Sequence, residues 1–327
     1  MIEQYINDLF QKLHLGKVIL PVETVSGGFM HRMYKVRTSE KIYAVKYLNP
    51  NIMARADAIS NFQRAEALEK IIEDAKIPIV PALIFDNRKM QNIDGQFFYI
   101  FDWHEGKITD WNHITTEQCH AAGGILGSIH AIESKTEKSD VPESHIDWEG
   151  YLSKARNTNV EIANLLEHNL QLLSHAENEV NKARKALPDF CCISDEDMDP
   201  KNVMWENGKP YVIDLECLDY GNPVSHVLQL SLQWAGITTC NLDLKLTKSF
   251  FKGYLEAYDN GFRAYDKVFG LAYTWIEWLE YNLNRALGNC MDDAEKSMGV
   301  SEVKNTLNRM RYIYEHEKEI LSVLHNL

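Results

Sequence analysis

The residues best suited to chemistry lie in two acidic segments near position 200. Residues 194–202 read Ser-Asp-Glu-Asp-Met-Asp-Pro-Lys-Asn, and residues 212–216 read Val-Ile-Asp-Leu-Glu. Asp197 precedes Asn202 by five positions, and Asp214 follows twelve positions later. A carboxylate base can serve an acceptor hydroxyl, while amide and carboxylate oxygens can hold Mg²⁺ on a nucleotide triphosphate. These residue types and spacings therefore predict a site for phosphoryl transfer.

A β-hairpin is predicted between the two segments. Apolar residues 203–205 and 211–213 flank the dipeptide Asn207-Gly208, which is typical of a two-residue hairpin turn. Antiparallel strands joined in this way bring their outer ends together. We therefore expect Asn202 and Asp214 to lie close in space, where both can reach one metal ion.

The two segments resemble the motifs of a known family. Protein kinases have an Asp-x-x-x-x-Asn catalytic loop followed by Asp-Phe-Gly. The aminoglycoside phosphotransferase and choline kinase-like family has Ser-His-x-Asp-x-x-Pro-x-Asn, followed by Ile-Asp-Trp/Phe-Glu. The present sequence matches this second pattern at Ser194, Asp197, Pro200, Asn202, Ile213, Asp214 and Glu216.

The resemblance implies both a fold and a set of roles. The fold is α+β, bilobal and protein-kinase-like, with a small lobe of a five-stranded antiparallel sheet plus a helix and a large, mostly helical lobe. Asp197 would be the catalytic base, and Asn202 and Asp214 would hold Mg²⁺. ATP or GTP would be the phosphoryl donor. The acceptor would be a hydroxyl of a small molecule, such as an aminoglycoside, a choline-like amine, a sugar or a hydroxy amino acid.

Two positions in these segments leave alternatives open. Asp195 stands where the family has His. An ionised Asp cannot donate a hydrogen bond, so it would have to accept from backbone N–H groups, and its charge beside Asp197 raises a carboxylate pKa. A second hypothesis is therefore a catalytically impaired relative that binds nucleotide without turnover. Glu216 would either support the metal ligands or lie exposed at the surface.

The acidic loop also allows two simpler interpretations. Asp195, Asp197 and Asp199 alternate as in an EF-hand calcium loop, with Glu206 at the twelfth place. However, the sixth place is Pro200, whose φ is locked negative where an EF-hand needs Gly. The flanking residues are also strand-like rather than helical. An ordinary acidic turn is the other alternative.

The first hundred residues carry the pattern expected of the small lobe. Turns are indicated at Gly27-Gly28 and Asp94-Gly95. Helical spacing of apolar residues covers 2–13 and 58–72. Strand patterns cover residues 18–25, 33–36, 42–48, 81–86 and 97–103.

The remainder of the chain is predominantly helical in pattern. We expect an N-terminal nucleotide-binding lobe over residues 1–103 and a C-terminal catalytic and acceptor-binding lobe over residues 104–327. The helical patterns of the second lobe cover residues 116–135, 148–186, 224–236, 241–259, 264–290 and 295–325.

Phosphate-binding residues are expected in the small lobe. Ser26, Gly27 and Gly28 lie between strand patterns, where glycine lets backbone N–H groups approach phosphates, although a plain hairpin turn is equally compatible. Lys46 closes Tyr-Ala-Val-Lys, which is similar to the Val-Ala-Ile-Lys strand of kinases. The resemblance implies that Lys46 contacts the α- and β-phosphates and that Glu66 orients it.

Further binding residues are expected at two places. Phe101, Asp102 and Trp103 would line the adenine site, mainly through backbone atoms. The acceptor is expected near Asp197, walled by the C-terminal helices. There, aromatic and acidic side chains could bind an amine-bearing alcohol through cation–π and carboxylate contacts, or could simply pack between helices. These side chains are Trp275, Trp278, Glu280 and Asn282.

Composition limits the remaining classes of function. The chain has 327 residues, of which 45% are hydrophobic and 25% charged, as in ordinary globular proteins. Its net charge of −13 argues against nucleic-acid binding and is compatible with a cationic substrate. Six cysteines without a Cys-x-x-Cys pair indicate reduced thiols. The sequence shows neither a secretory signal nor a membrane-length apolar run, so we expect a cytoplasmic protein; its oligomeric state stays open.

Overall fold

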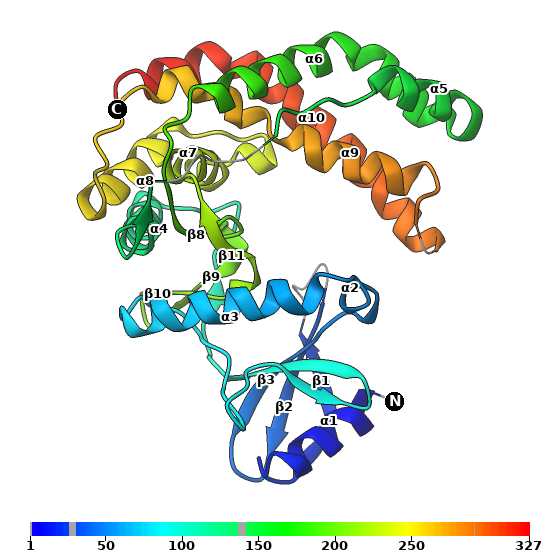
Figure 1. Ribbon diagram of the computed structural model, residues 1–327, viewed down its shortest axis with the longest axis vertical. Coiled ribbons are helices and arrows are strands. Elements are labelled where there is room, and N and C mark those ends of the chain that lie inside the picture. Colours follow the sequence, from blue (N-terminus) through cyan, green and yellow to red (C-terminus); the bar gives the residue numbers. More distant parts are fainter. Residues whose placement is uncertain (1, 26–30, 137–141, 291) are drawn as a thin grey trace. The chain divides into compact units, whose positions relative to one another are not determined.

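A computed structural model describes residues 2–25, 31–136, 142–290 and 292–327 of the chain (Figure 1). The acidic segments near position 200 group with the N-terminal strands rather than with the helices that surround them in sequence. The boundary expected after residue 103 stays a prediction. By its contacts, the chain divides into unit 1, Met1–Asp110 with Asp195–Asp219, and unit 2, Trp111–Ser194 with Tyr220–Leu327.

Unit 1 is built on the five-stranded antiparallel sheet that the sequence predicts, in the order β1-β2-β3-β5-β4. Its strands are β1 (Val18–Val25), β2 (Arg32–Thr38), β3 (Ile42–Tyr47), β4 (Gln91–Ile93) and β5 (Gln96–Asp102). Its helices are α1 (Ile2–Lys12), α2 (Pro50–Met53) and α3 (Ala58–Asp74).

The sheet of unit 1 buries side chains on both faces, because successive residues of a strand point to opposite sides. On one face, α1 packs against a cluster that includes Val45 and Ile100. On the other face, Phe62 of α3 packs with Tyr99 of β5. Figure 1 shows α1 and α3 on opposite sides of the sheet. Lys46 follows Val45, so its side chain points to the face that carries α3.

The strand expected over residues 81–86 is not present, and the hairpin partner of β5 is β4 instead. The segment instead ends in a tight turn, in which Asp86 and Asn87 have positive φ and Phe85 pairs with Arg88. The predicted turn at Asp94-Gly95 does connect two strands, and both residues have positive φ. It joins β4 to β5.

The predicted hairpin between the acidic segments is confirmed. Strands β9 (Val203–Glu206) and β10 (Lys209–Val212) pair antiparallel. Asn207 and Gly208 have φ of 51° and 76°, the left-handed values that a two-residue turn of this type requires. The short strand β6 (Lys107–Ile108) completes this sheet in the order β10-β9-β6.

Unit 2 is mostly helical, as expected, but two predicted helices are divided. The pattern over 148–186 breaks at Asn159, which is extended and caps the second helix by accepting from the Ile162 N–H group. The pattern over 264–290 divides into η4 (Tyr265–Tyr273) and α9 (Trp275–Ala286). The other α-helices are α4 (Thr116–His130), α5 (Trp148–Thr158), α6 (Val160–Lys185), α7 (Pro223–Trp234), α8 (Leu244–Ala257) and α10 (Asp293–Leu324).

Several short strands and 3₁₀ helices complete the secondary structure of the described residues. Strand β7 (Ser134–Lys135) pairs antiparallel with β8 (Cys191–Asp195). Within the described ranges, no helix is long and apolar enough to cross a membrane. The remaining short elements are η1 (Pro200–Asn202), η2 (Leu215–Cys217), β11 (Leu218–Gly221) and η3 (Ile237–Thr239).

Helices α4 and α8 approach each other so closely at Gly123 that no larger residue fits. A Cβ atom at this position would lie 2.0 Å from the carbonyl oxygen of Phe250. We expect Gly123→Ala to lower the free energy of unfolding by about 1–3 kcal/mol, as measured by urea unfolding, because the backbones must separate. Gly124→Ala is the matched control.

At Gly124 the added Cβ would lie 3.6 Å from the nearest atom, which is an ordinary contact. Alanine favours a helix by about 1 kcal/mol over glycine, so Gly124→Ala is expected to leave stability unchanged or to raise it slightly. Equal destabilisation by the two substitutions would contradict the close approach of α4 and α8.

Candidate functional site

The loop between β8 and β9 fixes the Asp197 carboxylate from two sides. The Lys201 ammonium donates to Oδ1 and the Asn202 amide donates to Oδ2, both at 2.9 Å. The loop closes as η1, whose first turn is capped by the Asp199 side chain. The Asp197 side chain is still 40% exposed. It is therefore oriented and yet accessible to a hydroxyl, as a general base must be.

Lys201 is a site residue that sequence reasoning missed. Its ammonium also donates to Asp199 Oδ2 at 2.7 Å. Burial acts to lower the pKa of Lys201, but the carboxylates of Asp199 and Asp197 outweigh burial and raise it. Lys201 therefore keeps a positive charge beside Asp197. The sequence signal is a spacing of four residues from Asp197, which any solvated lysine in an acidic turn would share.

Asn202 and Asp214 lie at the same end of the β9–β10 hairpin. Val203 is opposite Val212, and the Ile213 N–H group donates to the Asn202 carbonyl at 2.9 Å. The Asn202 amide group donates to Asp197 Oδ2 and, at 2.7 Å, to the Asp197 carbonyl. Because both amide hydrogens are used, the oxygen Oδ1 is the atom left to coordinate a metal.

These two oxygen donors fit Mg²⁺. An amide oxygen and a carboxylate are hard ligands, and Mg²⁺ typically takes one or two protein ligands while phosphates and water complete its shell. Among the described residues, no group of three or more His, Cys, Asp or Glu side chains is placed to hold a metal by itself. The EF-hand alternative also requires flanking helices, whereas β8 and β9 flank this loop.

Lys46 is buried and paired with the segment that carries Asp214. Its ammonium donates to Asp214 Oδ1 at 2.7 Å and lies 2.6 Å from Glu216 Oε1, and its side chain is only 6% exposed. Burial acts to lower the pKa of Lys46, but the two carboxylates outweigh it and raise the pKa. Of the two alternatives for Glu216, the structure shows the supporting position rather than an exposed one.

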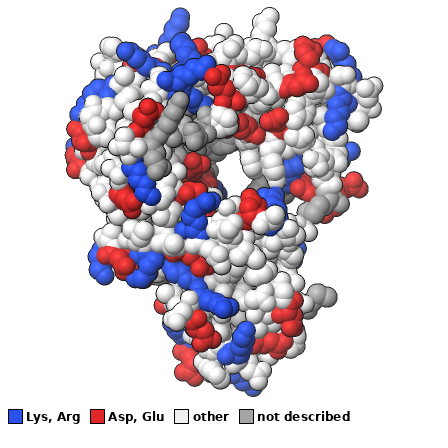
Figure 2. All heavy atoms as spheres, viewed as in Figure 1, with Lys and Arg blue, Asp and Glu red and all other residues white. Residues whose placement is uncertain are grey.

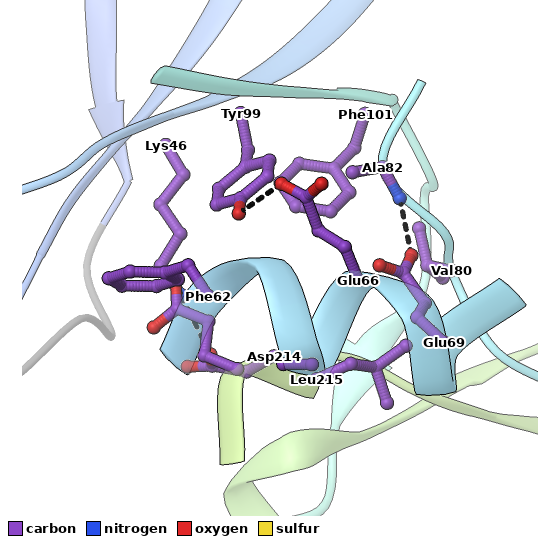
Figure 3. A pocket seen from close by; sticks show the side chains of 12 residues that line it. Lys46, Phe62, Glu66, Glu69, Val80, Ala82, Tyr99, Phe101, Asp214 and Leu215 are labelled. Atoms are coloured by element: carbon purple, nitrogen blue, oxygen red, sulfur yellow. Dashed lines mark hydrogen bonds and ion pairs between the residues drawn. The ribbon is translucent and has the colours of Figure 1, made fainter. Parts of the chain in front are cut away.

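The expected pairing of Lys46 with Glu66 is corrected by the structure. Glu66 Oε1 accepts from the Tyr99 hydroxyl at 2.7 Å and from the Met90 N–H group at 3.2 Å (Figure 3). Tyr99 is the cross-strand neighbour of Lys46 and points to the same face of the sheet. Its hydroxyl group, rather than the Lys46 ammonium, therefore binds Glu66. Burial, followed by this hydrogen bond, raises the Tyr99 pKa, which keeps Tyr99 a donor.

Lys46 and Glu66 nevertheless line one pocket in unit 1. Figure 3 shows Phe62 and Glu66 reaching into it from α3, with Tyr99 and Phe101 on the side of β5. Lys46 and the aromatic side chains of Phe62 and Phe101 therefore line the same pocket. Its other lining residues are Ala65, Glu69, Val80, Ala82, Asp214, Leu215 and Glu216.

The residues expected to line the adenine site differ in their surroundings. Phe101 lines the pocket, whereas the exposed Asp102 side chain binds Lys41 at the surface. The Lys35 ammonium lies 3.9 Å from the Trp103 ring centroid. A role for their backbone atoms stays a prediction. Ser26, Gly27 and Gly28 lie outside the described residues.

Asp195, the departure from the family pattern, is fully buried. Its Oδ1 accepts from the Asp197 N–H group at 3.0 Å, so it does accept from the backbone as expected. Its Oδ2 has no hydrogen-bond partner among the described residues. Burial, with the nearby Asp197 carboxylate second, holds the Asp195 pKa well above its usual range.

Asp195→Asn is expected to stabilise the protein increasingly as pH rises. Because the pKa of Asp195 is higher in the folded than in the unfolded state, the folded state binds the proton more tightly. The contribution of Asp195 to wild-type stability must therefore fall as pH rises from the unfolded pKa of about 3.9 toward the folded value. Asparagine keeps an acceptor for the Asp197 N–H group without a charge. Melting temperatures of both proteins from about pH 4 to pH 8 test this, and parallel profiles would contradict it.

The aromatic face of α9 is engaged by side chains of unit 2. The Arg309 guanidinium lies 3.9 Å from the Trp275 ring centroid. Trp278 stacks on Tyr281, and its Nε1–H group donates to Glu302 at 3.2 Å. A cationic acceptor over Trp275 would have to displace Arg309. This arrangement favours the packing alternative.

The polar members of the same helix also have partners in unit 2. Asn282 is buried, donates to the Trp278 carbonyl at 2.8 Å and accepts from Arg285 at 3.1 Å. Glu280 accepts from the Tyr151 hydroxyl at 3.1 Å. Their role in acceptor binding stays a prediction.

The fold and the site together define the class of protein. A five-stranded sheet with a buried strand lysine, joined to an acidic segment beyond an Asp–Asn loop, is the arrangement of a kinase-fold phosphotransferase. The model of the phosphotransferase enzyme family matches residues 21–280, and the chain belongs to this family. No curated protein sequence matches it significantly.

Solved structures show the same fold. Spectinomycin phosphotransferase, in complex with ADP and spectinomycin, is 13% identical with a TM-score of 0.67, covering 98% of this chain and 97% of that one. Amicoumacin kinase, in complex with AMP-PNP and Ca²⁺, is 12% identical with a TM-score of 0.61, covering 92% and 93%. Plasmodium vivax ethanolamine kinase is 16% identical with a TM-score of 0.58, covering 91% and 84%. The predicted protein-kinase-like α+β fold is thereby confirmed.

Proposed function

We propose that the protein is a small-molecule kinase that transfers the γ-phosphoryl group of ATP or GTP to a hydroxyl of a small acceptor, with aminoglycoside-like and choline-like amines as the first candidates. One observation carries the proposal. Within a single compact unit, Lys46 is paired with Asp214, and Asp197 is oriented by Lys201 and Asn202. This arrangement supplies a cation for phosphates, oxygen donors for a metal and a base for the acceptor.

Each residue has a defined task in the proposed reaction. Asp197 orients the acceptor hydroxyl and takes its proton as the new P–O bond forms. Lys46 contacts the donor phosphates. Asn202 and Asp214 would hold Mg²⁺, which when bound neutralises phosphate charge. In this scheme residues 1–103 form the nucleotide-binding lobe, and residues 104–327 contribute the catalytic and metal-binding residues and the acceptor site.

Two further observations support the donor and acceptor classes. Relatives of the same fold are described in complexes with ADP or with AMP-PNP and Ca²⁺, and another is an ethanolamine kinase. The net charge of −13 suits a cationic acceptor in the cytoplasm.

The charges on the surface do not favour nucleic-acid binding, which needs a continuous basic stripe. On the face shown in Figure 2, acidic side chains lie among the basic ones.

Release of ADP tests the proposal directly. The protein is incubated with ATP or GTP, Mg²⁺ and a panel of amino alcohols, aminoglycosides, sugars and hydroxy amino acids. We expect nucleoside diphosphate release that depends on one class of acceptor, with the phosphorylated acceptor identified by mass spectrometry. Nucleotide binding without release for any acceptor would instead favour the catalytically impaired alternative that Asp195 suggests.

A further inference from the structure

The carboxylate of Glu216 lies between the side chains of Lys46 on β3 and of His31, which precedes β2. Its Oε1 lies 2.6 Å from the Lys46 ammonium, and its Oε2 lies 3.2 Å from Nε2 of His31. The His31 side chain is 8% exposed and the Glu216 side chain is 18% exposed. A buried carboxylate requires compensation of its charge, and here the Lys46 ammonium forms an ion pair with Oε1 while His31 contacts Oε2.

The backbone fixes which nitrogen of His31 carries a hydrogen. His31 Nδ1 accepts from the Asn49 N–H group at 2.9 Å. A neutral imidazole with an accepting Nδ1 carries its hydrogen on Nε2, the atom that faces Glu216. The ring also lies beside Phe62, with centroids 6.1 Å apart. His31 is therefore oriented as a hydrogen-bond donor to Glu216 without needing a charge.

The other candidate carboxylate is committed elsewhere. Glu66 accepts from Tyr99 and from the Met90 N–H group, and the carboxylates that pair with Lys46 among the described residues are Asp214 and Glu216. Glu216 and Asp214 both belong to the segment that follows β10. The pairing therefore ties the strand lysine to this segment rather than to α3.

We propose that His31 and Glu216 are positioning residues for Lys46, in the task that kinases usually give to a carboxylate on a helix. The proposal rests on the proposed function, because it assigns Lys46 to the donor phosphates. Asp214 and Glu216 contact the Lys46 ammonium from the same segment after β10. His31 fixes the Glu216 carboxylate, so that the ammonium is held at a second point besides Asp214.

Substitutions of His31 separate its two hydrogen bonds. Glutamine places an amide donor near the position of Nε2, asparagine can keep the bond from the Asn49 N–H group, and leucine keeps neither. We expect His31→Leu and His31→Asn to raise the KM for nucleotide about ten-fold to a hundred-fold, the range for a lost hydrogen bond to a charged group. His31→Gln should restore most of the affinity, whereas a purely structural role would not distinguish glutamine from asparagine.

A second pair of variants compares the two carboxylates. Glu216→Gln is expected to raise the KM for nucleotide at least about ten-fold more than Glu66→Gln, since it removes a charged partner of a buried lysine. If Glu66→Gln has the larger effect, the inference is overturned.

A measurement without turnover separates this inference from the proposed function. Acetylation of Lys46 by an amine-selective reagent is followed by mass spectrometry, with melting temperatures confirming that each variant is folded. We expect Lys46 to react several-fold faster in His31→Leu and Glu216→Gln than in wild type, Glu66→Gln or His31→Gln. Equal rates in all variants would overturn the positioning role even in an active kinase. Absent turnover with the expected rates would overturn only the kinase assignment.

Discussion

Asp197→Asn is expected to lower kcat by about 10²- to 10⁴-fold while leaving nucleotide affinity nearly unchanged, because the amide cannot accept the acceptor proton. The substitution keeps the size of the side chain and one oxygen for Lys201 or Asn202, so the loop should keep its shape. Steady-state kinetics with the best acceptor give kcat, and a thermal shift with nucleotide reports binding.

Asp199→Asn is the matched control for this prediction. Asp199 lies in the same loop and shares Lys201 with Asp197, but it is largely buried and its side chain caps η1. We expect a smaller loss of kcat for Asp199→Asn than for Asp197→Asn. Comparable losses would show that the two carboxylates act through Lys201 and that Asp197 is not the base. Turnover of Asp197→Asn at the wild-type rate would also remove the assignment.

Asp214→Asn is expected to abolish most of the stabilisation that Mg²⁺ and nucleotide together give the protein. A ligand at 100 times its Kd stabilises by about 2.7 kcal/mol, and this gain disappears when the affinity falls a hundred-fold. Asparagine is preferable to alanine here, because Asp214 has φ of 63° and asparagine tolerates the left-handed region. The melting temperature with and without Mg²⁺ and nucleotide measures the effect.

The neighbouring Asp219 provides the control for Asp214. It also belongs to unit 1, but it lies exposed in a surface ion pair with Arg64. Exposed pairs contribute little, so Asp219→Asn should keep the full ligand-induced shift. An undiminished shift in Asp214→Asn would exclude Asp214 from the metal site.

The parts of the site that the sequence could predict are those with local signals. Asn207-Gly208 specifies its turn through the positive φ of both residues, and the register of the two strands then brings Asn202 and Asp214 to the same end of the hairpin. The strand that carries Lys46 is equally predictable from its run of β-branched, aromatic and other apolar residues. Such signals act between residues that are close in sequence, so they do not depend on the tertiary contacts made by the rest of the chain.

Partners across the fold could not be predicted in the same way. The sequence contains both Glu66 and Glu216, and nothing in their spacing shows which one reaches Lys46. The choice depends on Tyr99 binding Glu66 and on His31 binding Glu216, two contacts between elements far apart in sequence. Lys201 was missed for a related reason, since a lysine in an acidic turn is usually solvated.

Errors in the elements have equally specific causes. The strand expected over residues 81–86 overlooked the turn signal of Asp86-Asn87, both of which have positive φ. The division of the helix over 148–186 follows from Asn159, whose side chain is a strong helix start signal within a continuous apolar period. Hydrophobic periodicity alone does not reveal either interruption.

The grouping of residues 195–219 with unit 1 has a consequence for synthesis of the chain. Val80 and Pro78 exchange backbone hydrogen bonds with Val212, which is made more than a hundred residues later. The N-terminal unit therefore cannot be completed on the ribosome until residues 111–194 have also emerged. A fragment that ends at residue 110 would lack Asp197, Asn202 and Asp214, so this unit cannot be produced or exchanged between proteins as one uninterrupted stretch.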